Sequence, residues 1–262
     1  MPSWPATDWP GIAPEVGDTG RVDALVGERV VRESPQAVAD EVAGWVAGAA
    51  QRAVVDHAGF SIALAGGSTP RLLYETLAGP LWRERVDWPA WHVYFCDERA
   101  CPPDDPSSNY HLAQRTLLSR VPIDPLCVHR MPAERSDLDA AASEYSDLLA
   151  SSLPAGPGGA PRLDLILLGL GENGHTASLF PGTQALDVTD RWATRGLADY
   201  EPFDRLTLTF PTINASAAIG FMVTGAAKRQ ALAATAEGRV PASRVRPVDG
   251  TLVWFLDAAA AR

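Results

Sequence analysis

Four apolar runs, each ending in glycine or in charged residues, constrain the fold of this chain more than any other feature. They are FSIALAGG (60–67), WHVYFCDER (91–99), LDLILLGLG (163–171) and AIGFMVTG (218–225). Continuous apolar runs of this length are typical of strands that are buried on both faces of a parallel sheet. Because helix-like segments separate them, the sequence predicts an α/β fold, an open, mostly parallel Rossmann-like sheet with helices on both faces.

The segments between these runs carry strand and helix signals. Ser34 and Pro35 supply an N-cap and a first-turn proline, and apolar residues then recur on one helical face, which predicts a helix over about 35–52. Three further strands are expected at 28–33, 205–210 and 251–256. Later helices are expected to begin at Asn109, as an N-cap, and at Ser136, which with Asp139 approximates a capping box.

Length, charge and cysteine content narrow the class of protein. A chain of 262 residues, 46% of them hydrophobic, is expected to form a single domain over 1–262, with the Pro- and Trp-rich residues 1–24 as a surface arm. The net charge of −10 argues against nucleic-acid and anionic-membrane partners. No leader pattern and no apolar run of about 18 residues occurs, so membrane insertion and secretion are not expected. Three cysteines without a C-x-x-C pair indicate reduced thiols in the cytoplasm, and Cys96 and Cys101 lack the partner ligands of a metal site.

Four loops that follow strand-like runs carry polar residues: 66–69, 97–99, 171–175 and 224–228. In an open α/β sheet, ligands bind beyond the carboxyl ends of the strands. We therefore expect these loops to converge on one site, and a few cations there would suffice for a small anionic substrate.

The loop GLGENG (169–174) fits the G-x-G-x-x-G pattern of dinucleotide-binding sites. That fingerprint requires a helix of several turns after the third glycine, whereas Pro181-Gly182 ends any helix here early. A nicotinamide oxidoreductase therefore stays an alternative that only tight NADH binding would revive. Independently of a cofactor, Gly171 and Gly174 permit a tight turn that brings backbone N–H groups and His175 close to a ligand.

The second glycine loop, GGSTP (66–70), has the composition of a helix start. Ser68 or Thr69 can cap the helix and Pro70 can occupy its first position, after Gly66 and Gly67. Free N–H groups and the positive end of the helix dipole make such a start suitable for phosphate. A capped helix without a ligand is the alternative that this loop alone leaves open.

LAGGSTP, DER (97–99), SSNY (107–110), GLGENGHTASLFPG (169–182) and GAAK (225–228) occur in this order. With them the sequence resembles the 6-phosphogluconolactonase family, the α/β type that is related to glucosamine-6-phosphate deaminases. The resemblance covers roughly residues 25–257 and is most specific in GHTASLFPG. It implies hydrolysis of 6-phosphoglucono-1,5-lactone to 6-phosphogluconate, in the oxidative pentose phosphate pathway, without a metal or organic cofactor. The absence of H-E-x-x-H and G-x-S-x-G motifs agrees with direct attack by an activated water.

Within this resemblance, His175 is expected to act as general base toward water and then as acid toward the ring oxygen, since an ordinary histidine pKa of about 6.5 suits both steps. Many members of the family carry Asp where this chain has Asn173, and an amide cannot raise the basicity of a histidine as a carboxylate does. A charged orienter would then be Glu172 or Asp97, and we expect Asp97 because it leaves a separate strand end.

Three cations are candidates for the anionic parts of the substrate. Arg99 is expected to bind phosphate or to steady the lactone carbonyl, Lys228 to bind phosphate, and Arg205 to add a third positive charge. The expected catalytic residues are His175, Asp97 and Arg99. The expected substrate and phosphate contacts are Gly66, Gly67, Ser68, Thr69, Arg99, Asn173, Gly174, Arg205 and Lys228, with Asn109 a secondary one. The other histidines, His57, His92, His111 and His129, are expected to lie on the surface or in packing positions.

Two related functions compete with the lactonase. The deaminases typically carry a glutamate shortly after their histidine, whereas residues 176–182 contain no carboxylate and DER stands where deaminases show DEY. A non-catalytic sugar-phosphate sensor would lack the proton-transfer residue that His175 supplies. The expected partner is thus a small sugar-phosphate lactone, and the expected state is a monomer or a weak homodimer.

Overall fold

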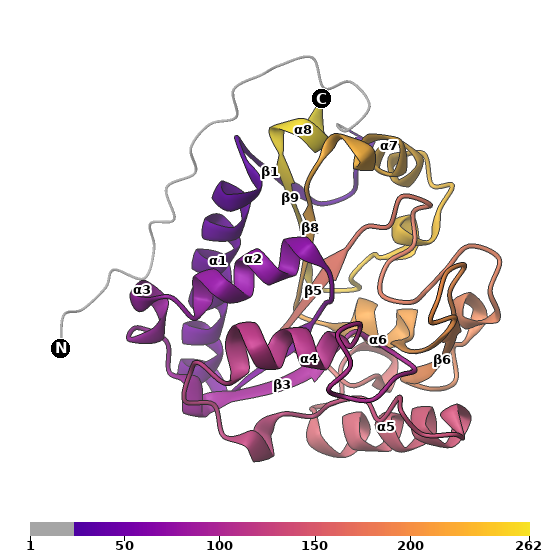
Figure 1. The fold of residues 1–262 in the computed structure, drawn as a ribbon, viewed down its shortest axis with the longest axis horizontal. Helices are drawn as coiled ribbons and strands as arrows, with labels where there is room; N and C mark the ends of the chain where they lie inside the picture. Colours follow the sequence, from indigo (N-terminus) through magenta and orange to yellow (C-terminus); the bar gives the residue numbers. More distant parts are fainter. Residues whose placement is uncertain (1–23) are drawn as a thin grey trace.

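Six parallel strands form the central sheet of the structure, a computed structural model that describes residues 24–262 (Figure 1). Their order across the sheet is β1 (Glu28–Arg32), β9 (Thr251–Asp257), β8 (Ala218–Val223), β5 (Leu165–Gly169), β2 (Phe60–Leu64) and β3 (Trp91–Phe95). Every pairing between neighbours is parallel, so the carboxyl ends of all six strands lie at one edge. The α/β prediction with a mostly parallel sheet is confirmed.

Three antiparallel strands form a second, smaller sheet in the order β4 (Asp97–Arg99), β7 (Asp204–Leu208) and β6 (Ala193–Leu197). The prediction of one strand over 91–99 was wrong, because the chain leaves the main sheet at Cys96 and β4 joins the second sheet. The expected strand at 205–210 exists as β7, but it too lies in the second sheet. Strand β6 was not predicted.

Helices cover both faces of the main sheet. The helices are α1 (Pro35–His57), α2 (Ser68–Leu77), α3 (Pro80–Arg83), α4 (Asn109–Ala113), α5 (Leu138–Ser152), α6 (Phe210–Ala215), α7 (Arg229–Ala236) and α8 (Ala258–Ala261). On one face, Trp45 of α1 packs 5.2 Å from Phe255 of β9, measured between ring centroids. The neighbouring Trp254 must point to the opposite face, since side chains alternate along a strand. There its ring stacks on that of Phe221 at 4.0 Å.

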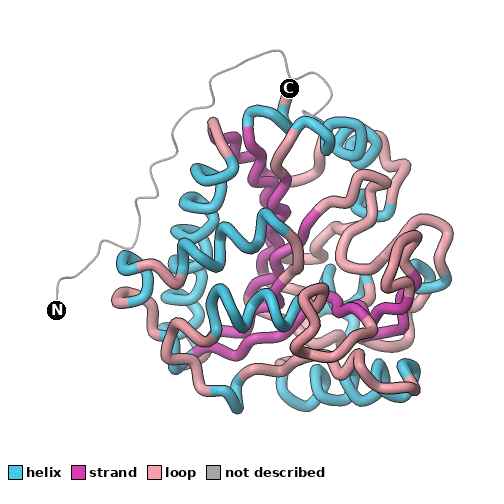
Figure 2. The backbone as a smooth tube through the Cα atoms, viewed as in Figure 1, coloured by secondary structure: helices cyan, strands magenta, loops and turns pink. Residues whose placement is uncertain are grey.

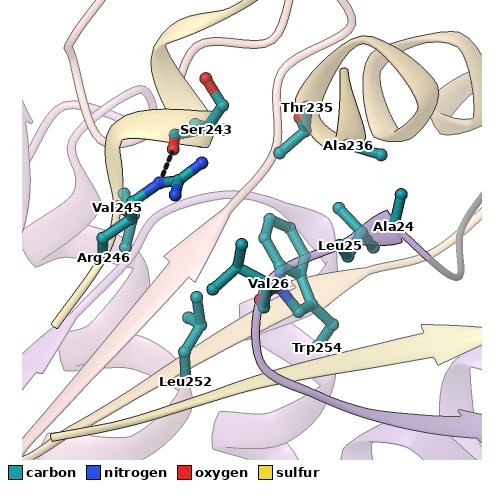
Figure 3. A pocket seen from close by; sticks show the side chains of 11 residues that line it. Ala24, Leu25, Val26, Thr235, Ala236, Ser243, Val245, Arg246, Leu252 and Trp254 are labelled. Atoms are coloured by element: carbon teal, nitrogen blue, oxygen red, sulfur yellow. Dashed lines mark hydrogen bonds between the residues drawn. The ribbon is translucent and has the colours of Figure 1, made fainter. Parts of the chain in front are cut away.

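A small pocket on the Trp254 face separates β9 from the end of α7 (Figure 3). Trp254 and Leu252 line it from the strand, and Thr235 and Ala236 line it from the helix. It contains none of the residues that the sequence predicts for the site, so it only confirms that α7 covers this face.

For helix α1, the sequence predicted the N-terminal cap correctly and placed the C-terminal end too early. The Ser34 hydroxyl accepts from the Ala37 N–H at 3.2 Å, as predicted. The helix continues beyond residue 52 to His57, because Ala53 extends the buried face and the chain turns only at Ala58, which has a φ of 62°.

The other predicted caps were each displaced. Helix α2 begins after Gly67 without a side-chain cap, α4 is capped by the Ser108 hydroxyl, and α5 by the Asp137 carboxylate. Ser68, Thr69, Asn109 and Ser136 are therefore not caps. The two true side-chain caps, Ser108 and Asp137, are direct neighbours of the predicted residues. Several residues in a row can accept from the first turn, and packing selects among them.

The structure bears on three further expectations: the N-terminal arm, membrane insertion and the state of the cysteines. The expected arm comprises residues 1–24, of which 1–23 lie outside the described residues. From residue 24 onward, no helix is both long and apolar enough to cross a bilayer. The cysteines are all free, and the thiol of buried Cys96 lies 3.1 Å from the Leu167 carbonyl oxygen.

Candidate active site

Long loops gather on one side of the molecule, on the right of the view in Figure 2, beyond the strand ends. The turn that holds His175 follows β5 directly. The Gly174 N–H donates to the Gly171 carbonyl at 3.0 Å, and the Gly171 N–H donates to the His175 carbonyl at 2.8 Å. A β-carbon on Gly171 would lie 2.0 Å from His175 Nδ1, so the imidazole lies directly over the backbone of this glycine. Gly174 has a φ of 80°, which only glycine adopts readily.

No helix follows this turn. Residues 175–180 form a compact turn in which the Thr176 hydroxyl donates to the Gly169 carbonyl at 2.9 Å. A dinucleotide fingerprint would place the N-terminus of a helix here to face the pyrophosphate. The G-x-G-x-x-G pattern therefore serves to present a histidine and does not form a nucleotide loop.

The Asn173 side chain fixes the imidazole of His175. Asn173 Oδ1 lies 3.0 Å from the His175 backbone N–H and 2.6 Å from its Nδ1. The backbone N–H can only donate, so the atom that faces it is the amide oxygen, and Nδ1 must then carry a hydrogen. When the ring is neutral, its single hydrogen is therefore on Nδ1, and Nε2 carries the lone pair that can accept a proton.

The surroundings of His175 are partly apolar. Its ring stacks on Phe180 at 4.0 Å and lies 6.4 Å from the Tyr200 ring. Burial lowers the pKa of His175 to about 4, the nearby carboxylates of Asp97 and Asp199 act in the opposite direction, and Lys228 and Arg205 add to the lowering. The histidine is therefore held in the neutral state that a general base requires.

Asp97 lies close to His175 but does not hydrogen-bond to it. The Ser178 hydroxyl donates to Asp97 Oδ2 at 2.7 Å, and Asn109 Nδ2 lies 3.1 Å from its Oδ1. The hydrogen bond on His175 Nδ1 therefore comes from Asn173, and the Asp97 carboxylate acts on the ring only through space. Glu172, the other candidate orienter, is exposed.

Buried Asn109 joins the first glycine loop to this carboxylate. Its Nδ2 also donates to the Asp97 backbone carbonyl at 2.9 Å. A β-carbon on Gly66 would lie 1.7 Å from Asn109 Oδ1, so Gly66 is needed for these two segments to meet. Asn109 is a structural link between loop 66–67 and β4, in addition to the substrate contact that the sequence predicts.

The predicted phosphate end combines loops 66–69 and 224–228. The hydroxyls of Thr69 and Thr224 lie 2.8 Å apart, and the Gly225 N–H donates to the Asp257 carboxylate at 2.9 Å. Ser68 and Gly67 are exposed at the uncapped start of α2, where the positive end of the helix dipole is directed outward. Within residues 24–262, the Lys228 ammonium has no hydrogen bond or ion pair, and Lys228 is the only lysine in the sequence.

Arg99 and Arg205 lie directly opposite each other on β4 and β7. Directly opposed residues of an antiparallel pair share one face of the sheet, so two like charges are neighbours there. Arg205 is 1% exposed, and its Nη1 and Nη2 have no hydrogen-bond partner among the described residues. Burial and the charge of Arg99 lower the pKa of Arg205. A buried guanidinium whose Nη atoms have no hydrogen-bond partner among the described residues, beside a second arginine, is the arrangement expected of an anion site.

Glu98, the middle residue of the DER motif, has a structural role between its two neighbours. Its buried carboxylate accepts from the backbone N–H groups of Asn109 and Tyr110 at 2.7 and 2.8 Å and from the Ser108 hydroxyl at 2.9 Å. Burial raises the pKa of Glu98, and these hydrogen bonds oppose the rise. Glu98 thus anchors the start of α4, while Arg99 donates to the Ser107 carbonyl.

Contacts among these groups join the four predicted loops. The other histidines lie elsewhere: His57 pairs with Asp164 at 3.0 Å, and His92 stacks on His129 with their ring centroids 5.7 Å apart.

Three residues of the site, Asp199, Tyr200 and Ser178, were not predicted from the sequence. Asp199 accepts from Asn173 Nδ2 at 2.8 Å, and the Arg205 guanidinium carbon lies 5.2 Å from the Tyr200 ring centroid. No local signal marks Asp199 or Tyr200, because they come from the hairpin between β6 and β7.

Comparisons with known proteins find similarity to this chain in both sequence and fold. The family described as glucosamine-6-phosphate isomerases/6-phosphogluconolactonase matches residues 33–254. The 6-phosphogluconolactonase of Nostoc sp. is 42% identical over 212 residues, which cover 79% of this chain and 86% of that protein. The 6-phosphogluconolactonase of Synechocystis sp. is 42% identical over 211 residues, which cover 79% and 85%.

Two solved structures show how widely the fold is shared. The 6-phosphogluconolactonase from Trypanosoma brucei superposes with a TM-score of 0.81 at 30% identity and covers 90% of this chain and 98% of its own. A monomeric glucosamine-6-phosphate deaminase superposes with a TM-score of 0.75 at 22% identity and covers 89% and 98%. The likeness to the deaminase concerns the fold alone, so the chemistry must be argued from the site.

Proposed function

The chain belongs to the glucosamine-6-phosphate isomerase/6-phosphogluconolactonase family, and from this premise we propose that it acts as a 6-phosphogluconolactonase. The reaction is the hydrolysis of 6-phosphoglucono-1,5-lactone to 6-phosphogluconate in the pentose phosphate pathway. The observation that carries the proposal is the hydrogen bond between His175 Nδ1–H and Asn173 Oδ1, which leaves Nε2 as the atom that takes a proton. Burial agrees with this role, since it lowers the pKa of His175 to about 4 and so favours the neutral ring.

In the proposed mechanism, His175 Nε2 takes a proton from a water molecule as the oxygen of that water attacks the lactone carbonyl carbon. The carbonyl becomes a tetrahedral oxyanion, which then collapses as the bond from that carbon to the ring oxygen breaks. The imidazolium returns its proton to the departing ring oxygen, which becomes a hydroxyl group. The new carboxylic acid releases its proton to solvent, so the products are 6-phosphogluconate and one proton.

The cations of the site divide between the two anionic parts of the substrate. Arg205 is buried, and its Nη atoms have no hydrogen-bond partner among the described residues. It is therefore suited to the charge that develops on the carbonyl oxygen, because preorganised donors in a site of low polarity stabilise such charge strongly. Lys228 and the start of α2 at Gly67, Ser68 and Thr69 are suited to the phosphate. Arg99 lies beside Arg205 and is assigned to either group, as the sequence predicts.

Other residues of the site shape it without taking a proton. Gly66 and Gly174 permit close backbone approach, and Asp97 stabilises the imidazolium through space. The mechanism uses only water and residues of this chain. We place the reaction in the cytoplasm because the three cysteines are free.

The decisive test is a coupled assay on freshly generated 6-phosphogluconolactone, corrected for its spontaneous hydrolysis, beside an assay on glucosamine 6-phosphate. We expect turnover of the lactone well above background and none of the amino sugar. His175→Ala should lower kcat at least about 100-fold with a modest change in KM, which is the contribution typical of general-base catalysis. His92→Ala, at an exposed position on β3, is the control and should behave as wild type. A near-wild-type kcat in His175→Ala would refute the assignment of the base.

A further inference from the structure

We propose that Asp199 is a positioning residue, which acts through the side chain of Asn173 to hold His175 as the Nδ1–H tautomer. The inference rests on the proposed role of His175 as the general base. It adds a carboxylate that supports the base from a different hairpin and across an intervening amide.

The hydrogen bonds of Asn173 run in one direction, with donation passing from the ring through the amide to the carboxylate. Asn173 Nδ2 donates to Asp199 Oδ2 at 2.8 Å, and Asn173 Oδ1 accepts from His175 Nδ1 at 2.6 Å. A carboxylate can only accept, so Asp199 selects the NH₂ side of the amide. The amide oxygen must then face His175, and this determines which ring nitrogen carries the hydrogen.

Asp199 opposes the one rearrangement that would disable the base. If the Asn173 amide turned over, its NH₂ group would face the His175 backbone N–H, and its oxygen would face the Asp199 carboxylate. Both new contacts are repulsive. The His175 backbone N–H, which donates to Oδ1 at 3.0 Å, sets the same preference locally. Asp199 therefore reinforces an orientation that the turn alone holds with a single donor.

The carboxylate also favours the charged imidazolium that forms during the reaction. Charged groups that act on His175 are Asp97 and Asp199, which raise its pKa, and Lys228 and Arg205, which lower it. The uncharged rings of Phe180 and Tyr200 pack beside the imidazole. The charge of the Asp199 carboxylate thus offsets, through space, part of the lowering of the His175 pKa that burial causes.

The hairpin that carries Asp199 holds the imidazole at a second point. Residues 198–203 connect β6 to β7, and the Ala198 N–H donates to the Phe203 carbonyl at 2.7 Å across the base of this loop. Tyr200, one residue after Asp199, packs against Phe180 with ring centroids 5.8 Å apart. The loop thus contacts both the amide partner and the stacking partner of His175.

The test compares Asp199→Ala and Asp199→Asn with Glu201→Gln as the matched control. Glu201 is an exposed carboxylate in the same loop, and it has no hydrogen bond or ion pair with any described residue. Asn at 199 can still accept from Asn173 Nδ2, whereas Ala cannot. The readouts are kcat and KM for the lactone and the ¹⁵N chemical shifts of the His175 imidazole, which distinguish the two tautomers without any substrate.

We expect Asp199→Ala to lower kcat about tenfold, which corresponds to about 1.4 kcal/mol in the barrier, with KM within twofold and a mixture of tautomers at His175. Asp199→Asn should keep the Nδ1–H tautomer and lose less activity, and Glu201→Gln should match wild type. Adding Asn173→Asp to Asp199→Ala, which places a carboxylate directly on the ring, should restore most of kcat.

An unchanged tautomer in Asp199→Ala, or a kcat equal to that of Glu201→Gln, would overturn the positioning role. Thermal unfolding of each variant separates a lost fold from a lost hydrogen bond. If wild-type protein showed no lactone hydrolysis above background, the proposed function would fail, while the tautomer measurement would still decide the role of Asp199.

Discussion

At the scale of single residues, the site depends on positions where a side chain is missing as much as on those that carry chemistry. Gly171 leaves the space in which the imidazole of His175 lies, and Gly66 leaves the space for Asn109. Adding one methyl group at either position would push a functional side chain away from its hydrogen-bond partner. The glycines of both motifs thus help to position His175 and its neighbours.

The state of His175 predicts an unusual titration. Because burial lowers its pKa to about 4, the ring should stay neutral and able to accept a proton well below the value of about 6.5 that is normal for histidine. NMR titration of the free protein should give a midpoint near 4, with His175→Gln identifying the signal. At saturating substrate, kcat should fall only where His175 becomes protonated.

Bound substrate should move this midpoint in a defined direction. Lys228 and Arg205 lower the pKa of His175, so a ligand whose phosphate faces Lys228 and whose carboxylate faces Arg205 should raise it. The midpoint measured with saturating 6-phosphogluconate should therefore exceed that of the free protein. A free-protein midpoint near 6.5 would contradict the apolar setting of the ring.

At the scale of elements, the β4–β7 pair places two guanidinium groups face to face. Gly196 of β6 lies opposite Arg205, and a β-carbon there would come within 2.9 Å of the Ser178 carbonyl oxygen. The third strand therefore makes room for the loop that carries Ser178 to cover the arginines. Such an arrangement is unfavourable for folding and suited to binding an anion, as expected where function opposes stability.

Replacing Arg205 should separate these two effects. Arg205→Met keeps a long apolar stem but removes a buried charge without a hydrogen-bond partner. We expect the free energy of unfolding to rise by about 1–2 kcal/mol, since apolar replacements of buried charges are often stabilising. The loss of an interaction with the developing oxyanion should lower kcat/KM at least about 100-fold.

The measurements are thermal unfolding and the corrected lactone assay. Arg195→Met is the control, because Arg195 is exposed on β6 and pairs with Asp204. It should change stability and activity little, as is usual for surface ion pairs. A less stable Arg205→Met protein would show that Arg205 has a structural role instead.

At the scale of the whole molecule, the site exists only because segments far apart in the chain meet at one edge of the sheet. The Thr69–Thr224 contact spans 155 residues, and the Ser178–Asp97 contact spans 81. Each segment follows the carboxyl end of a strand or belongs to the second sheet. Parallel pairing is what brings these ends together.

The single lysine allows a direct test of the phosphate end. An amine-reactive label can modify only Lys228 and the N-terminal amine, since the sequence has no other lysine. At ten times its dissociation constant, 6-phosphogluconate should slow labelling of Lys228 about tenfold, while the N-terminal amine serves as the internal reference. Mass spectrometry of the labelled peptides measures both sites, and equal labelling of Lys228 with and without ligand would place the phosphate elsewhere.

Local signals in the sequence predicted the main-sheet strands well, because their apolar runs reflect burial on both faces. They failed at Cys96, where the apolar pattern of residues 91–95 continues but the chain changes sheets. A hydrophobic pattern indicates whether a residue is buried, but it does not indicate which other strand its own strand pairs with. For the same reason, the split between β3 and β4 could not be predicted from residues 91–99.

By itself, the sequence determined the α/β class and the glycine turn that carries His175, and it named the candidate cations. Tertiary structure alone decided the partners: Asn173 and not Asp97 on the imidazole, Asp199 behind Asn173, and Arg99 opposite Arg205. The physical reason is the separation along the chain over which each interaction acts. Turn geometry and strand burial depend on neighbours in the chain, whereas hydrogen bonds and opposed charges depend on which distant strands pair.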